Sequence, residues 1–224
     1  MGISRTLLLS TAALLAASCA LQAESGNWGG QIGGAQPSGD AKAWVGQTSG
    51  FSVDILDTYP LGNQDAVRMR FGFTTFKATS ANPETLVLSS TAAASYPANT
   101  VNELFTFTYG GEYVYTLPAR LYVLGGLGVA YVTATRKGTF DLTSAGNGQV
   151  ATNYSANNFV PYFCAGAGWQ ITPTLALEAR WQTTSLKAQV RPIDLSAGGF
   201  TAPGQVQFDK LSVSSLSLGL SLTF

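Results

Sequence analysis

The sequence contains no histidine, and only 11% of its residues are charged. Without histidine, neither a Ser-His nor an Asp-His pair is available as nucleophile and base, which excludes hydrolytic mechanisms of that type. The chain holds only two cysteines, so zinc ligand sets built from His or paired Cys are missing as well. The formal net charge is zero and gives no long-range field that would attract nucleic acid. We therefore expect no metal, no cofactor and no nucleic-acid partner.

A long hydrophobic run is also missing from the body of the chain. A transmembrane helix needs about 20 consecutive apolar residues, which excludes a helical membrane span after the N-terminal segment. Residues 1–23 differ from the rest, because Arg5 is their only charge and residues 7–17 form an apolar run followed by small residues. This pattern predicts a secretory signal peptide that is cut after Ala23. Residues 24–224 then form a single mature domain.

Cys19 allows a second interpretation of the N-terminal segment. The sequence Ala-Ser-Cys that ends at Cys19 resembles the lipobox of bacterial lipoproteins, in which the cysteine is acylated, although Ala16 replaces the usual leucine. If the segment is instead discarded as a signal peptide, Cys164 is the only mature cysteine. No intramolecular disulfide can then form, and Cys164 is expected to be a small interior hydrophobic residue.

Residues 104–136 carry the clearest pattern in the chain. Alternate positions are apolar or aromatic, while the positions between them hold glycine, hydroxyl groups and a carboxylate. A period of two predicts β-strands, because successive side chains of a strand point to opposite faces. Pro118 cannot donate a hydrogen bond to a neighbouring strand, so we place it in the tight turn between two strands. The apolar set includes Phe105, Phe107, Tyr109, Tyr113, Tyr115, Leu121, Val123, Leu127, Val129 and Tyr131.

The composition of the second face indicates which side is inside. A strand surface that faces water would be rich in Lys and Glu, whereas this face is crowded with Gly and Ala. Small residues suit the interior of a narrow barrel, where bulky side chains do not all fit. The aromatic face is then the outside, and an apolar outside indicates lipid.

The same pattern occurs along the rest of the chain. Short connections are expected at Pro60, Pro118 and Pro173, and long ones at residues 36–49, 79–100, 137–157 and 186–208. An even number of strands with short turns on one side and long loops on the other is typical of outer-membrane barrels. The fold class predicted is all-β, an eight-stranded antiparallel transmembrane up-and-down β-barrel. Its expected strands are residues 27–35, 50–57, 66–77, the two strands of the hairpin in residues 104–136, and residues 159–170, 175–185 and 216–224.

Two strands carry an irregularity. Pro161 near the start of the sixth strand predicts a loose ladder at that point. Leu211 and Val213 fall on the opposite parity from Leu216 onward, so we expect a β-bulge near Ser214 and Ser215.

The charged residues of the central strands all fall on the inward positions. Three are acidic and three are basic, so they are expected to form ion pairs, since buried charges must be partnered. A gated polar pathway and catalysis by a carboxylate pair remain alternative roles for the same residues. The Gly-Gly-Leu-Gly sequence at residues 125–128 lies within a strand with no helix after it, so it is a packing feature and no phosphate loop. The inward charges are Asp54, Arg68, Arg70, Glu112, Glu178 and Arg180.

Three segments carry a family resemblance: YTLPARLYVLGGLGVAY from Tyr115, GAGWQITPTLALEARW from Gly166, and the terminal LSLTF. They resemble the small eight-stranded outer-membrane β-barrel family, similar to the transmembrane domain of outer membrane protein A. The resemblance implies a Gram-negative cell outer membrane, with lipid and lipopolysaccharide as surroundings and a monomeric barrel. It also implies that the terminal aromatic Phe224 is the signal presented to the barrel-assembly machinery.

Function is expected to be structural or surface-exposed, without catalysis. The alternative is a narrow pore, or a barrel that transports or captures a small solute, including an apolar one, as the similar outer membrane protein W barrels are thought to do. A lipid-modifying enzyme is a third and less favoured interpretation.

Overall fold

The computed structural model describes residues 27–46, 49–80, 84–89, 92–96, 98–141, 149–197, 200–208 and 210–224. The predicted signal peptide and Cys19 lie outside these ranges.

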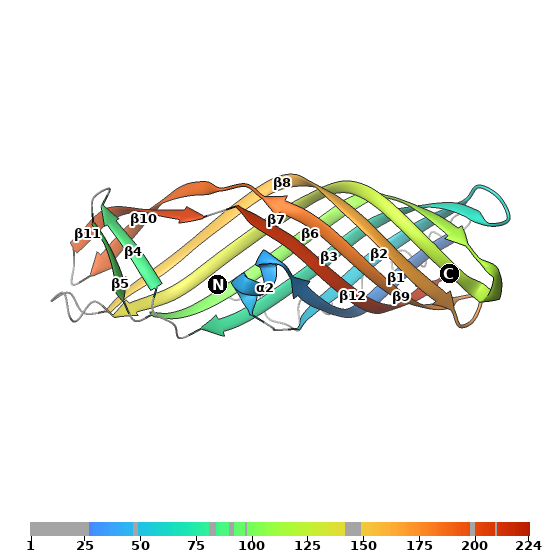
Figure 1. Ribbon diagram of the computed structural model, residues 1–224, viewed down its shortest axis with the longest axis horizontal. Helices are drawn as coiled ribbons and strands as arrows, with labels where there is room; N and C mark the ends of the chain where they lie inside the picture. Colours follow the sequence, from blue (N-terminus) through green and yellow to red (C-terminus); the bar gives the residue numbers. More distant parts are fainter. Residues whose placement is uncertain are drawn as a thin grey trace.

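Eight antiparallel strands close into one barrel, in the order β1-β12-β9-β8-β7-β6-β3-β2. Pairing between the first and last strands of the chain closes the ring (Figure 1). The predicted eight-stranded antiparallel barrel is therefore confirmed. Its strands are β1 (Asn27–Ser38), β2 (Gly50–Pro60), β3 (Asp65–Ser80), β6 (Ala98–Thr116), β7 (Leu121–Asp141), β8 (Gln149–Gln170), β9 (Leu175–Leu186) and β12 (Leu211–Thr223).

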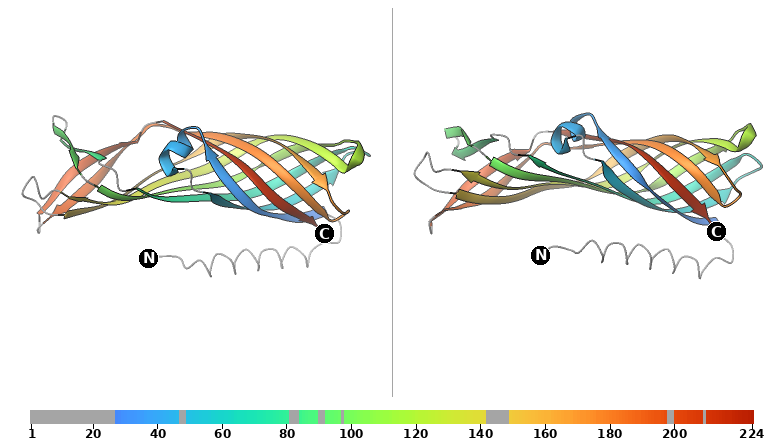
Figure 2. Two further views of the ribbon diagram at one scale, coloured as in Figure 1. Left: turned by 60° about the horizontal axis from the view of Figure 1, so that its bottom comes forward. Right: turned by 90° about the horizontal axis from the view of Figure 1, so that it is seen from below.

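The long connections contain regular structure of their own. A short helix α2 (Asp40–Val45) joins β1 to β2, and two small hairpins follow, β4–β5 (Glu84–Ser89 and Ala92–Tyr96) and β10–β11 (Gln189–Ala197 and Phe200–Phe208). Both hairpins gather at one end of the barrel, and the C terminus lies near the other end (Figures 1 and 2). The short connections, residues 61–64, 117–120 and 171–174, all lie at the end of the C terminus, as predicted.

Apolar side chains cover the outside of the barrel. Phe107 and Leu220 are 42% and 47% exposed, whereas their neighbours Thr108 and Ser221 are only 2% and 4% exposed. Rings of adjacent strands also contact each other on the outer face, such as Phe71 with Tyr109, at 4.6 Å between centroids. The predicted inside and outside faces are therefore those observed.

Most strands are longer than predicted. The expected loop at residues 137–157 is wrong for most of its length, because β7 continues to Asp141 and β8 begins at Gln149. The pairing of β7 with β8 continues in one register to Asp141–Gln149. The loops expected at residues 79–100 and 186–208 are also partly wrong, because these residues include the hairpins β4–β5 and β10–β11.

The predicted bulge near Ser214 and Ser215 is wrong. The ladder between β12 and β9 runs in one unbroken register from Leu211–Leu186 to Leu222–Leu175. Leu211 and Val213 point inward and are buried. Odd-numbered residues thus face inward along the whole of β12. The inward residues are polar near Ser217 and Ser221 and apolar at Leu211 and Val213.

Pro161 interrupts a ladder as predicted. Pairing of β8 with β9 begins at Tyr162–Thr184 and runs toward the turn, and Pro161 keeps only its partner on β7, Val129. The Thr184 hydroxyl donates to the Pro161 carbonyl oxygen at 2.8 Å, in place of a further ladder bond. A proline without N–H thus marks the point where the two strands separate.

Candidate functional site

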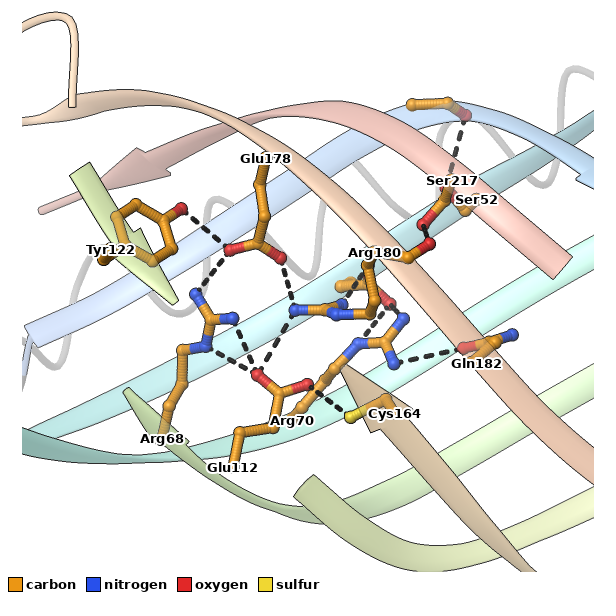
Figure 3. Close-up of polar contacts among 12 residues, drawn as sticks. Ser52, Arg68, Arg70, Glu112, Tyr122, Cys164, Glu178, Arg180, Gln182 and Ser217 are labelled. Carbon is orange, nitrogen blue, oxygen red and sulfur yellow. Dashed lines mark hydrogen bonds and ion pairs between the residues drawn. The ribbon is translucent and has the colours of Figure 1, made fainter. Parts of the chain in front are cut away.

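The six charged residues that the sequence places inward lie together inside the barrel (Figure 3). Four strands supply them: β2, β3, β6 and β9. All six are almost fully buried, with the most exposed of them, Arg68, at 5%. The cluster, called the ion network below, consists of Asp54, Arg68, Arg70, Glu112, Glu178 and Arg180.

Two carboxylates and two guanidinium groups form the centre of the ion network. Arg68 Nη2 lies 2.7 Å from Glu112 Oε2, and Arg68 Nη1 lies 2.9 Å from Glu178 Oε2. Arg180 Nη2 contacts the same two carboxylates, Glu178 Oε1 at 2.5 Å and Glu112 Oε2 at 3.2 Å. The four groups therefore alternate in charge around a ring (Figure 3).

Asp54 extends the ring toward the loop side of the lumen. Arg70 approaches Asp54 Oδ1 through Nη2 at 2.6 Å and through Nε at 3.0 Å. Arg180 Nη1 lies 3.4 Å from Asp54 Oδ2. Every carboxylate of the network thus contacts two guanidinium groups, and Arg180 contacts all three carboxylates.

The six residues are paired because they are buried. A charge removed from water carries a penalty of several kcal/mol, roughly, which only close partners offset. Three acidic and three basic groups balance the charge, so none of the six is left without an opposite partner. Arg180 Nε is nevertheless a buried donor without a hydrogen bond.

Uncharged side chains also contact the ion network. The sequence analysis considered only charged residues and therefore did not identify them. The Tyr122 hydroxyl donates to Glu178 Oε2 at 2.8 Å, and Arg70 Nη1 donates to Gln182 Oε1 at 3.2 Å. Cys164 is interior as expected, but it contacts a carboxylate rather than only hydrophobic neighbours, with its Sγ 3.5 Å from Glu112 Oε1. The strand parity of these residues was the available signal, since all lie on inward positions.

Glycines on the neighbouring strands make room for these side chains. A Cβ atom at Gly126 would lie 2.7 Å from Glu112 Cγ, and one at Gly72 would lie 2.5 Å from Asp54 Oδ1. The glycine-rich sequence at residues 125–128 thus lies within β7 and faces the lumen at Gly126.

Toward the loop end, the interior beyond the ion network is largely apolar. Helix α2 lies across the mouth of the barrel and contacts β12, β1, β6 and β3. Since β12 and β6 are four places apart in a ring of eight strands, the helix bridges opposite walls. Its residues Ala41 and Val45 are fully buried in the apolar cluster below. No pattern in the sequence indicated this helix.

The charges of the ion network are paired with one another. Each carboxylate contacts two guanidinium groups. Within the described ranges, no three His, Cys, Asp or Glu side chains are grouped as metal ligands. The arrangement can fill and brace the lumen.

Phe224 lies at the turn end of the barrel. Its ring is largely exposed, and its backbone N–H donates to the Trp28 carbonyl oxygen at 2.7 Å. The last residue therefore continues the seam between β12 and β1.

Among the described residues no helix is long and apolar enough to cross a membrane. A closed barrel with apolar side chains outside and partnered charges inside is the architecture of a transmembrane β-barrel of the outer membrane. The chain matches the outer membrane protein beta-barrel domain family over residues 7–224, and it belongs to that family. Its location is accordingly the outer membrane.

Solved structures of similar fold are also outer-membrane barrels. A major outer membrane protein from Thermus thermophilus is 16% identical with a TM-score of 0.60, covering 90% of this chain and 100% of that one. The outer membrane protein OprG from Pseudomonas aeruginosa is 11% identical with a TM-score of 0.54, covering 89% and 96%. The attachment invasion locus protein Ail of Yersinia pestis, in complex with the heparin analogue sucrose octasulfate, is 16% identical with a TM-score of 0.50, covering 89% and 99%. At these identities the likeness shows the fold alone, and a search of curated proteins finds no match.

Proposed function

We propose that this protein is a closed outer-membrane barrel with a structural or surface-exposed role and without catalysis. One observation carries the proposal: the ion network joins opposite walls of the lumen, and α2 bridges opposite walls at its mouth. A continuous water path would need the first to separate and the second to move. The absence of histidine agrees with a role without hydrolysis.

The end of the barrel that carries the two small hairpins is the surface that the protein would present. Outer-membrane barrels carry their longer loops outside the cell. We therefore assign β4–β5 and β10–β11 to the exterior, together with the extended ends of β7 and β8. The proposal includes lipid and lipopolysaccharide around a monomeric barrel, and recognition of Phe224 by the barrel-assembly machinery.

Conductance in planar bilayers tests the closed lumen. The expected result is no steady current for the purified wild-type protein. A narrow pore predicts the opposite, a steady current that Glu112→Ala or Arg180→Ala abolishes. Shortening residues 186–208 tests the surface role separately, because it should reduce binding to host or other surfaces while the barrel stays intact.

A second candidate function is the capture of a small apolar solute. The apolar part of the lumen beneath α2 favours this function. A barrel with a purely structural role could be filled by ion pairs along its whole length. The two candidates differ in whether α2 ever leaves its place.

A further inference from the structure

The apolar half of the lumen, called the loop-side lumen below, is lined from opposite sides of the barrel. Its apolar residues are inward-facing and buried, and they belong to one cluster that also includes Ala41 and Val45 of α2. The buried polar residues among their described inward neighbours are uncharged, in contrast with the ion network, and include Thr74, Thr100, Asn102, Thr106, Thr184 and Ser215. The apolar lining includes Ala35, Phe76, Leu104, Val132, Leu186 and Val213.

Helix α2 has little stability of its own. It is six residues long and has no side-chain cap at its N terminus. Isolated helices of this length do not form in water, so contacts with the barrel hold α2 together. The position of the helix therefore depends on its contacts with the barrel strands.

A glycine hinge lies at each end of the helix. Gly39 has φ 60° and ψ −138°, and Gly46 has φ 68° and ψ −158°. This region of backbone space is essentially open to glycine alone. The chain changes direction at these two glycines, so a rotation there would leave β1 and β2 intact.

Polar contacts at the rim hold the cover in place. The Ser212 N–H on β12 donates to Asp40 Oδ2 at 3.0 Å, and Asn102 Nδ2 on β6 donates to the Trp44 carbonyl oxygen at 2.9 Å. The Arg136 guanidinium carbon on β7 lies 4.3 Å from the centre of the Trp44 ring. These contacts lie at the mouth of the barrel.

We propose that the loop-side lumen is a binding site for a small apolar molecule that enters from outside, and that α2 is its hinged cover. The inference rests on the second candidate function, because a cover has a role only if a ligand passes it. The lining is mostly apolar and its charged side chains, such as Arg136, lie at the rim, so it selects against charged and strongly hydrogen-bonding molecules. The ligand would bury apolar surface where Ala41 and Val45 now lie, which offsets the exposure of these two residues.

The movement of the cover can be tested without any ligand. Val45→Cys places a thiol on the buried side of α2, and its reaction with a charged methanethiosulfonate reagent reports opening in intact barrels. The wild-type protein measures the background from Cys164, and Ala43→Cys gives the rate for the exposed side of the helix. We expect slow labelling at position 45 that rises at least tenfold when Arg136→Ala is added, and no rise with the control Lys137→Ala. An equal labelling rate at position 45 with and without Arg136→Ala would contradict the proposal that α2 is a movable cover.

The binding site is tested with a small apolar photoreactive diazirine in the same membranes, followed by mass spectrometry. Adducts on the inward residues Phe76 and Leu104 are expected, and an excess of n-nonane should reduce them. Phe107 on the lipid face is the control and is labelled in either case. Labelling of Phe107 without labelling of Phe76 and Leu104 overturns the binding site, and with it the second candidate function. Neither experiment measures conductance. The proposal that the wild-type lumen is closed is therefore tested separately, by the planar-bilayer measurement.

Discussion

Arg68 on β3 and Glu178 on β9 form an ion pair across the whole width of the barrel, with Nη1 and Oε2 2.9 Å apart. The two strands lie four places apart in a ring of eight and therefore face each other. Residues separated by 110 positions in the chain thus connect opposite walls. A lumen crossed in this way is braced and blocked by the same contact.

Removing Glu178 should destabilise the barrel strongly. Glu178→Ala leaves Arg68 and Arg180 each with one carboxylate fewer in a buried site, and breaking a buried pair costs about 3–5 kcal/mol. Urea unfolding in lipid vesicles measures the change. Glu103→Ala is the matched control on the surface and should cost under about 1 kcal/mol. Equal losses for the two variants would contradict a structural role for the ion network.

The lipid face makes a second prediction. Leu218 is 56% exposed on the outside of β12, and an arginine near the middle of the bilayer costs about 2–4 kcal/mol. Leu218→Arg should therefore block assembly, whereas Ser217→Thr on the inner face should keep its hydroxyl and be tolerated. Heat-modifiable gel mobility of the membrane fraction reports folding of each variant. If both variants assembled equally well, the two faces would be assigned wrongly.

The turn between β6 and β7 contains a local strain. Ala119 and Arg120 have φ of 62° and 61°, a region that costs a residue other than glycine about 1–2 kcal/mol. Ala119→Gly should relieve part of this cost and raise the free energy of unfolding by up to about 1 kcal/mol. The control Ala165→Gly lies in the extended strand β8 and should lower it by about 0.5–1 kcal/mol. A destabilised Ala119→Gly variant would show that the turn is unstrained.

A surface cluster predicts a pH dependence. Lys77 and Lys137 flank Glu103 at 3.0 and 2.8 Å on the outer face, two positions beyond Phe105 toward the loops. Outward charges indicate that this level lies outside the hydrocarbon. The hydrogen bond from Lys137 lowers the pKa of Glu103 below its ordinary value, with Lys77 acting in the same direction.

Because the folded state lowers this pKa, the stabilisation is present above the ordinary carboxyl pKa and is lost as the pH falls through the lowered one. The unfolding free energy of the wild type should therefore exceed that of Glu103→Gln by a small amount at pH 7. The difference should shrink as the pH is lowered, and it should also shrink in high salt. A difference that grows toward acid pH would contradict the assignment.

Strand parity predicted the inward position of Arg68 and Glu112, because the period of a strand does not depend on its partners. It could not predict that Arg68 also reaches Glu178, since that contact depends on strand order and tilt around the closed ring. Leu211 and Val213 were misjudged because parity was tied to polarity, and the interior changes from ionic to apolar along the lumen. Helix α2 gave no signal, because six residues are too few for a helical period and burial alone makes them helical.

Bilayers with spin labels on the lipid acyl chains test the central claim most directly, because paramagnetic broadening of methyl signals reports contact with hydrocarbon. The account predicts broadening of Leu218, Leu220 and Leu222 on the outer face, with the signals of Leu104 and Val132 unaffected in the lumen. Broadening of Leu104 and Val132, with sharp signals from the three outer leucines, would contradict it.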